Sequence, residues 1–270
     1  MFYALSFPAI DPVALDLGFF QVRWYALAYI VGLLLAWRYL LYLARLPPKT
    51  MERKDADDLL VWMALGVILG GRLGYVAFYK PGYYLDYPLE ILQLWQGGMS
   101  FHGGLLGVVV AGLWFCRQRN LRVWQVGDLI ACCGPIGLFL GRIANFINGE
   151  LYGRVTDAAV GMVFPGGGPL PRHPSQLYEA MLEGLVLFVL LAVLVHRESI
   201  RRRPGLISGV FLIGYGLARS AAEVFREPDA HLGFILGPVT MGQLLSVPMI
   251  VIGVAIVLYA RRRPVLAADG

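Results

Sequence analysis

Seven long apolar runs recur along the chain and are separated by short polar segments. A helix rises about 1.5 Å per residue, so runs of this length can cross the hydrocarbon layer of a membrane, which is about 30 Å thick. Backbone groups have no water partners in lipid, and no ten-residue alternation indicates a barrel, so continuous helices are expected. The predicted spans are residues 22–43, 59–79, 99–115, 125–147, 176–196, 205–224 and 238–260.

Positive charge is unevenly divided between the two sets of loops. Most of the 23 Lys and Arg residues follow the first, third, fifth and seventh spans, and such residues mark the cytoplasmic side of a membrane protein. We therefore predict an all-α polytopic membrane protein with seven transmembrane helices. Its N-terminus lies outside, its C-terminus is cytoplasmic, and a small outer loop at residues 150–172 joins the fourth and fifth spans.

Composition agrees with this prediction and narrows the class of protein. Hydrophobic residues make up 58% of the chain and charged residues 15%, whereas about 25% of a soluble domain is charged. The runs continue from end to end without a linker or repeat, so we expect a single domain over residues 1–270. The net charge of +5 lies in loops where topology already requires positive residues, so a nucleic-acid partner is not expected.

The N-terminal segment and the cysteines indicate neither processing nor cross-links. Residues 1–20 contain no Lys or Arg, unlike a cleavable signal peptide, so we expect them to stay attached at the membrane surface. The cysteines lie in or beside apolar runs without Cys-x-x-Cys spacing, so neither a disulfide nor a zinc site is indicated. They are Cys116, Cys132 and Cys133.

Charged and amide side chains gather at the outer ends of several predicted spans. An ionisable residue at the centre of a membrane helix costs roughly 2.5 to 3.5 kcal/mol, so such residues are functional candidates. On the fourth span the stripe is Arg142, Asn145 and Asn148, with Glu150 just beyond, and on the sixth it is Tyr215, Arg219 and Glu223, spaced by four. Tyr25, Arg72, His102, Glu179 and Glu183 fall at comparable depth on other spans.

A purely structural role is the alternative for these residues. Arg142 could pair with Glu150, and Arg219 with Glu223, only to hold helices together. Buried ion pairs are weak evidence for stability, and a cluster from five or six spans exceeds what helix register requires, so function is favoured. Pairing explains Arg72, Glu179 and Glu183 equally well. Asp128, at the opposite end of the fourth span, is expected to reach water and needs no function.

The kinds of residue present exclude several chemistries. The four histidines are scattered and no His-Glu-x-x-His occurs, so neither a metal nor another cofactor is expected. No serine sits in a nucleophile elbow, and only one Asp lies well within a span, which disfavours an intramembrane protease. Arginines, amides, a histidine and carboxylates remain, a set that suits binding a phosphate and moving a proton.

These residues resemble a known family, the bacterial prolipoprotein diacylglyceryl transferases. The family pattern Gly-Arg-x-x-Asn-Phe-x-Asn-x-Glu-x-x-Gly reads without departure at residues 141–153, and the match spans nearly the whole chain. Further matching segments are Arg23-Trp24-Tyr25, Gly71 to Tyr75, Phe101 to Gly104, His173 to Glu179, and Tyr215 through Asp229.

The resemblance implies an inner-membrane enzyme with a periplasmic N-terminus and a site toward the periplasmic leaflet. It would transfer the diacylglyceryl group of phosphatidylglycerol to the lipobox cysteine thiol of prolipoprotein signal peptides, forming a thioether and releasing glycerol phosphate, the first step of lipoprotein maturation. The loop at residues 150–172 resembles a compact version of the family's periplasmic head. A transporter or flippase, or a noncatalytic scaffold, is the alternative, but no repeat is visible and the cluster lies outside the midplane.

Roles follow from the resemblance together with the chemistry. Arg142 and Arg219 would stabilise the departing phosphate, and either His102 or Glu150 would accept the thiol proton. These four residues are the predicted catalytic set. The predicted phosphatidylglycerol-binding residues are Tyr25, Arg72, Arg142, Asn145, Asn148, Gly153, Tyr215, Arg219 and Glu223.

Overall fold

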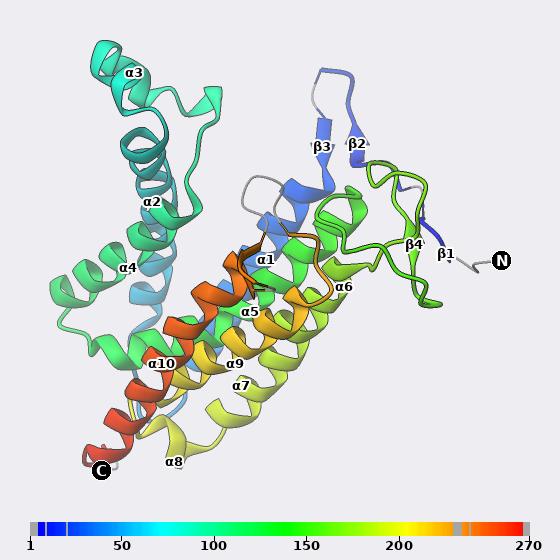
Figure 1. Ribbon diagram of the computed structural model, residues 1–270. Coiled ribbons are helices and arrows are strands. Elements are labelled where there is room, and N and C mark those ends of the chain that lie inside the picture. Colours follow the sequence, from blue (N-terminus) through cyan, green and yellow to red (C-terminus); the bar gives the residue numbers. More distant parts are fainter. Residues whose placement is uncertain (1–4, 9, 20, 229–233, 238, 267–270) are drawn as a thin grey trace. The chain divides into compact units, whose positions relative to one another are not determined.

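The computed structural model describes residues 5–8, 10–19, 21–228, 234–237 and 239–266 (Figure 1). Within it the chain forms two compact units. Unit 1 comprises residues 1–40 and 127–270, and unit 2 comprises residues 41–126. The expectation of a single domain stays a prediction. Asp229 of the last matching segment and residue 238 of the seventh predicted span lie outside the described residues.

Unit 2 is built on two helices that pack side by side, α2 (Arg53–Tyr79) and α4 (Phe101–Gln118). Glycines on both helices bring the backbones into contact. A Cβ atom on Gly66 would lie 2.7 Å from the carbonyl oxygen of Gly107, and one on Gly74 would lie 2.7 Å from the Cα of Gly103. Small residues at such a crossing are typical of helices that pack within a membrane. Three short helices join the pair: α3 (Pro81–Asp86), η1 (Pro88–Leu92) and η2 (Leu94–Gln96).

Unit 1 contains the remaining helices, and the longer ones run alongside one another in Figure 1. They are α1 (Trp24–Leu43), α5 (Val123–Ile147), α6 (Ser175–Glu179), the π-helix η3 (Ala180–Val186), α7 (Leu187–Val195), α8 (Glu198–Arg201), α9 (Leu206–Glu223) and α10 (Met241–Arg262). The last residues of α1 and the first of α5 belong to unit 2. Segments α6, η3 and α7 form one continuous helix of 21 residues. The π-helix widens it at Gly184, where an added Cβ would lie 2.8 Å from the Phe139 backbone on α5.

Short strands occur at one end of unit 1. β1 (Leu5–Ser6) pairs in parallel with β4 (Met162–Val163), so the N-terminal segment packs on the loop at residues 150–172. β2 (Val13–Asp16) pairs antiparallel with β3 (Gln21–Arg23), and β5 (Phe234–Leu236) with β6 (Val239–Thr240). The hydrophobic pattern predicted none of these strands, because each is only two to four residues long.

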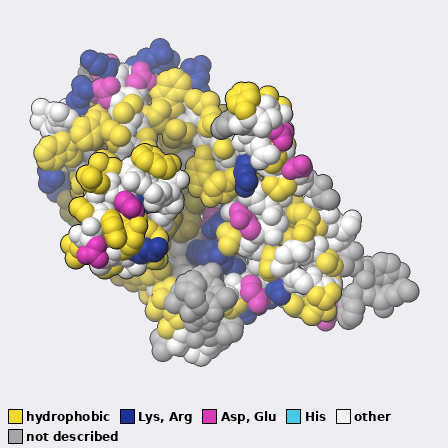
Figure 2. Space-filling view, turned by 90° about the horizontal axis from the view of Figure 1, so that it is seen from above, with side chains coloured by type: hydrophobic (Ala, Val, Ile, Leu, Met, Phe, Trp, Pro, Cys, Tyr) yellow, Lys and Arg dark blue, Asp and Glu magenta, His cyan; other side chains and the backbone are white. Residues whose placement is uncertain are grey.

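Every predicted span coincides with a helix. Five of these helices are long and apolar enough to cross a membrane: α1, α2, α5, the 175–195 helix and α10. The third and sixth predicted spans are α4 and α9, which have 18 residues each. Many large apolar side chains are exposed along the helices, and hydrophobic side chains occupy much of the surface seen in Figure 2. Such surface suits lipid, and the chain is a mostly helical, multi-pass membrane protein.

Two details differ from the sequence predictions. Helix α2 begins at Arg53, six residues before the predicted start at residue 59. Its polar first turns were excluded by hydropathy, but the Glu52 backbone N–H donates to the Asp55 carboxylate (3.1 Å) and so caps the helix.

The prediction that Asp128 reaches water is wrong, because its residue is only 4% exposed. Its carboxylate accepts the backbone N–H of Gly205 (2.8 Å) and both the backbone N–H and the hydroxyl of Ser208 (2.7 and 2.6 Å). Asp128 on α5 therefore satisfies the free N–H groups at the start of α9, where a helix has no partners of its own.

Candidate functional site

The charged residues of unit 1 converge on one group, which we call the arginine–glutamate cluster. Its members are Arg142, Glu179, Glu183, Arg219, Glu223 and Arg226. They come from the last turns of α5, the junction of α6 and η3, and the end of α9 with the segment that follows it. The 175–195 helix contributes residues near its start, and α5 and α9 contribute residues near their ends, so the side chains of these three stretches meet.

The contacts within the cluster are close. The Arg142 Nη2 lies 2.7 Å from the Oε2 of Glu179, and the Arg219 Nη1 lies 2.9 Å from the same oxygen. The Arg219 Nη2 lies 2.7 Å from Glu223, as the structural alternative supposed for two residues four apart on one helix face. The alternative pairing of Arg142 with Glu150 does not occur among the described residues, since Arg142 faces Glu179 and Glu183 instead.

Glu150 has a separate set of partners. Its Oε1 accepts from the Nδ2 of Asn145 (2.8 Å) and from the Nδ2 of Asn148 (3.3 Å), so both amides of the α5 stripe orient this carboxylate. The backbone turn that carries Glu150 is fixed as well: the Gln176 Nε2 donates to the Glu150 carbonyl (2.6 Å), and the Ser175 hydroxyl donates to the Leu151 carbonyl (3.0 Å).

This turn is strained, which explains why it needs support. Leu151 has a φ of 58°, a left-handed conformation that costs a non-glycine residue about 1–3 kcal/mol. Gln176 and Ser175 are fully buried, and they are the first residues of α6. Both residues belong to the matching segment His173 to Glu179, but no role was predicted for them.

Gly153 lies where three backbone segments meet. Its N–H donates to the His173 carbonyl (2.8 Å), and it forms an antiparallel bridge with Arg226. A Cβ atom at this position would lie 2.8 Å from both the Cβ and the carbonyl oxygen of His173. No side chain fits, so Gly153 brings the loop after α5 against the segment that carries Arg226.

The two tyrosines predicted to bind phospholipid both belong to unit 1. Tyr25 opens α1 and is 38% exposed, and its hydroxyl lies 3.1 Å from that of Tyr29. Tyr215 lies one turn before Arg219 on α9, with its ring stacked near Phe211 at 6.1 Å between centroids. Binding of phospholipid by Tyr25 and Tyr215 stays a prediction.

The loop at residues 150–172 is tied to the end of α9 through Arg172. The Arg172 guanidinium donates to the Gly167 carbonyl (2.8 Å), pairs with Glu227 (3.0 Å) and lies over the Tyr152 ring. Next to it, burial lowers the pKa of His173, whose Nδ1 lies 3.1 Å from the Tyr178 hydroxyl.

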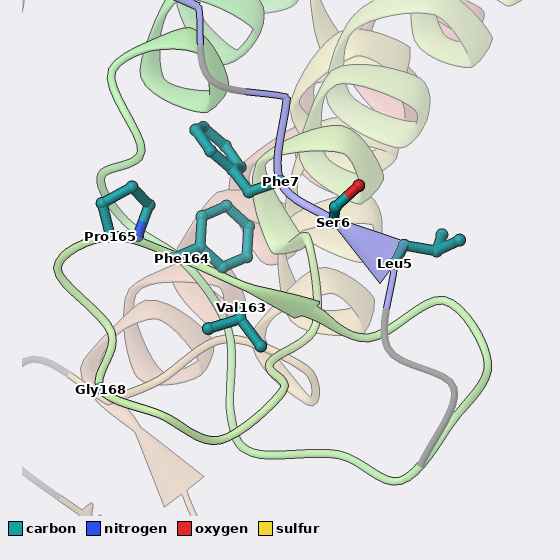
Figure 3. Close-up of a pocket in the computed structure, with 7 residues that line it drawn as sticks. All are labelled: Leu5, Ser6, Phe7, Val163, Phe164, Pro165 and Gly168. Carbon is teal, nitrogen blue, oxygen red and sulfur yellow. The ribbon is translucent and has the colours of Figure 1, made fainter. Parts of the chain in front are cut away.

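A hollow lies beside this loop, apart from the arginine–glutamate cluster. Figure 3 shows the rings of Phe7 and Phe164 next to each other, and their centroids are 5.1 Å apart. Phe146 of α5 packs on both. The residues that line the hollow are Leu5, Ser6, Phe7, Val163, Phe164, Pro165 and Gly168.

Arg72 and His102 belong to unit 2. The Arg72 side chain is buried, lies over the Tyr84 ring, and donates to five backbone carbonyls of the loop between α2 and α4. Those carbonyls belong to Glu90, Ile91, Gln93, Gly97 and Gly98. This arrangement favours a role in holding the loop, while phospholipid binding by Arg72 stays a prediction. His102 is exposed in the first turn of α4, after the N-cap Ser100.

Glu179 and Glu183, which pairing alone could explain, and Arg226, for which no role was predicted, all belong to the cluster. The signal available was the matching segment His173 to Glu179, which ends on this glutamate. Among the described residues, no group of three or more His, Cys, Asp or Glu side chains is placed to hold a metal ion.

Fold and cluster together define a multi-pass membrane protein that gathers arginines and glutamates within its helices. The model of the family described as prolipoprotein diacylglyceryl transferase matches residues 12–259, and the chain belongs to this family. It is 61% identical to the phosphatidylglycerol–prolipoprotein diacylglyceryl transferase of Paramagnetospirillum magneticum, over 99% of this chain and 100% of the relative. Relatives of the same name from Rhodospirillum rubrum (61%, over 100% and 99%) and Azospirillum brasilense (60%, over 97% and 98%) are similarly close.

Proposed function

We propose that this transferase moves the diacylglyceryl group of phosphatidylglycerol to the lipobox cysteine of prolipoprotein signal peptides. The close relatives are named for phosphatidylglycerol and prolipoprotein. The observation that carries the proposal is the pair Arg142 and Arg219, held side by side on one Glu179 oxygen. Two planar guanidinium groups in one place suit the phosphate of an anionic lipid better than two lysines would.

The reaction makes specific demands on these side chains. The cysteine sulfur forms a bond to the glyceryl carbon that carries the phosphate, and the bond from that carbon to the phosphate oxygen breaks. The electron pair leaves with the oxygen as glycerol phosphate, and the thiol proton passes to a base. Arg142 and Arg219 stabilise the charge that develops on the phosphate, and their side chains are only 18% and 15% exposed.

A base is needed because a free thiol has a pKa of about 8.5 and is mostly protonated at neutral pH. The two candidates are His102 and Glu150. Glu150 is held by Asn145 and Asn148, and His102 is exposed at the start of α4. If His102 is the base, His102→Asn lowers kcat at least 100-fold and Glu150→Gln has the smaller effect. The reverse result assigns the proton to Glu150.

The proposal includes the topology. Seven spans, a periplasmic N-terminus and an inner-membrane location place the arginine–glutamate cluster at the outer leaflet, level with phospholipid headgroups. Single cysteines in place of Asp157 and Arg203 test it, because these exposed or partly exposed positions lie in opposite loops. A thiol reagent that does not cross the membrane should label intact cells at residue 157 and not at residue 203. The opposite pattern would reject the orientation.

Transfer itself is tested with purified protein, phosphatidylglycerol vesicles and a lipobox peptide. Mass spectrometry should detect a peptide whose cysteine carries one diacylglyceryl group, and glycerol phosphate should appear in equal amount. A peptide with serine in place of the cysteine is the control for attachment at the thiol. An unmodified cysteine peptide, in a mixture where a known transferase works, would refute the proposal.

A further inference from the structure

Glu179 lies at the centre of the arginine–glutamate cluster and has no side chain exposure. One of its oxygens, Oε2, is shared by the Nη2 of Arg142 at 2.7 Å and the Nη1 of Arg219 at 2.9 Å. Both of its oxygens lie 3.4 Å from the Nη1 of Arg226. A single carboxylate therefore contacts three arginines that come from two other helices and the segment after α9.

The arginines would repel one another without this carboxylate. Two guanidinium nitrogens that share one oxygen at these distances lie within about 6 Å of each other. Like charges at that separation repel one another, and more strongly where burial lowers the effective dielectric constant. The negative charge of Glu179 between them offsets this repulsion and fixes the distance between the two guanidinium groups.

Glu183 provides a natural comparison within the same helix. It is equally buried, but its oxygens lie 3.6 and 3.7 Å from the same arginine nitrogens. Neither oxygen accepts a hydrogen bond from a described residue. Glu183 thus contributes charge alone. Glu179 accepts hydrogen bonds from Arg219 and Arg226, which orient those planar guanidinium groups, and its ion pair with Arg142 is closer than that of Glu183 (2.7 against 3.6 Å).

The remaining sides of the arginines stay available. Side chain exposure is 18% for Arg142 and 15% for Arg219, compared with none for Glu179, so the carboxylate holds them from the buried side. Within the described part of the chain, Arg142 uses only its Nη2 and Arg219 only its Nη1 and Nη2. Unused N–H groups on each guanidinium are free to donate to an anion.

We propose that Glu179 is a positioning residue, which holds Arg142 and Arg219 in the spacing that binds the phosphate of the lipid substrate. Glu179 does not touch the substrate and acts through the two guanidinium groups. This inference rests on the proposed transfer from phosphatidylglycerol and adds to it the residue that arranges the phosphate-binding pair.

The primary test compares Glu179→Gln with Glu183→Gln, two changes of the same chemistry at equally buried positions one turn apart. Glu179→Gln should lower kcat/KM for phosphatidylglycerol about 100-fold, because the arginines lose their shared partner and separate. Glu183→Gln should lower it less than fivefold. Glu179→Asp keeps the charge but shortens the reach, and should recover at least tenfold of the loss. Equal losses for the two Gln variants would overturn the proposal.

A double-mutant cycle separates positioning from a general loss of structure. In an Arg142→Lys background the spacing between two guanidinium groups is already lost, so adding Glu179→Gln should lower kcat/KM less than threefold further. Losses that multiply across the cycle would mean that Glu179 acts elsewhere, and would overturn the proposal. If Glu179→Gln does not fold in detergent, Glu179→Asp takes its place in the same cycle.

The wild-type protein and the Glu179→Gln variant together distinguish an error in the proposed activity from an error in the proposed role of Glu179. A wild-type protein that neither transfers the lipid nor binds phosphatidylglycerol in native mass spectrometry refutes the proposed function. A wild-type protein that transfers normally, together with a Glu179→Gln variant of wild-type kcat/KM, refutes the positioning role alone.

Discussion

Arg72 in unit 2 and the pair Arg142 and Arg219 in unit 1 are arginines within helices of a membrane protein, but their partners differ. Arg72 donates to five backbone carbonyls and is almost fully buried. The two cluster arginines contact carboxylates on one side, and part of each side chain stays exposed. The first arrangement is complete without a ligand, and the second is not.

The difference gives a physical criterion for the role of a buried arginine. A guanidinium has five N–H donors, and each one left without an acceptor in an apolar environment costs free energy. Where the protein supplies all the acceptors, as it does for Arg72, the residue holds structure together. Where donors remain, as they do on Arg142, a bound anion would complete the set.

The largest expected effect comes from replacing an arginine of the cluster, which should lower the turnover number of the enzyme. Arg142→Ala should lower kcat about 1,000-fold, because one donor to developing charge is worth 100- to 1,000-fold in comparable sites. Arg142→Lys keeps the charge but not the planar pair of donors, and should still lose about 100-fold. Activity is measured with the lipobox peptide, and Arg203→Ala, at a loop position partly exposed to solvent, is the control. If Arg142→Ala keeps a kcat within tenfold of wild type, the conclusion that Arg142 keeps donors for a substrate anion is wrong.

Replacing Arg72 should have the opposite effect. It should lower the local stability of the loop between α2 and α4 and leave the affinity for phosphatidylglycerol unchanged. In Arg72→Ala the carbonyls of Glu90, Ile91 and Gln93 lose their charged donor, which should cost about 2–4 kcal/mol of local stability. Hydrogen exchange at residues 88–98 should become at least tenfold faster.

Arg53→Ala, at an exposed position on the same helix, should leave this exchange unchanged. The affinity of the folded Arg72→Ala protein for phosphatidylglycerol, measured by native mass spectrometry, should stay within threefold of wild type. A large loss of affinity with normal exchange would instead support the predicted role of Arg72 in binding phosphatidylglycerol.

The sequence predicted the helices well because lipid leaves few alternatives: an apolar run long enough to span must form backbone hydrogen bonds within itself. It also placed Arg219 and Glu223 on one helix face, since residues four apart on a helix are neighbours, and the two side chains do contact each other. Both predictions depend on neighbours along the chain, whose relation is set by helix geometry alone.

Pairings between helices could not be predicted in the same way. Whether Arg142 meets Glu150 or Glu179 depends on how α5 rotates against the 175–195 helix, and the π-helix at residues 180–186 changes the rotation of that helix locally. Charge and spacing identified Arg142 and Glu150 as candidates, but they did not show that Asn145 and Asn148 turn toward Glu150. The contacts of Arg72 were likewise hidden, because its acceptors are backbone atoms and leave no pattern in the side chains.

The same criterion, whether the protein supplies every hydrogen-bond partner, applies to the buried carboxylate of Asp128. Its replacement has the smallest expected effect. Asp128 accepts from two backbone N–H groups and one hydroxyl at the start of α9, so its hydrogen bonds are complete and a structural role is expected. Asp128→Asn replaces one acceptor oxygen with an N–H₂ group that faces the donors, and should cost about 1–3 kcal/mol.

Thermal unfolding in detergent measures this cost as a lower midpoint for Asp128→Asn, while Asp157→Asn, at an exposed loop position, should leave the midpoint unchanged. The kcat of folded Asp128→Asn should stay within threefold of wild type, because the residue lies at the end of α5 opposite to Arg142. A normal midpoint with a large loss of kcat would show that a complete set of hydrogen bonds does not identify a structural residue here, and would weaken the same reasoning for Arg72.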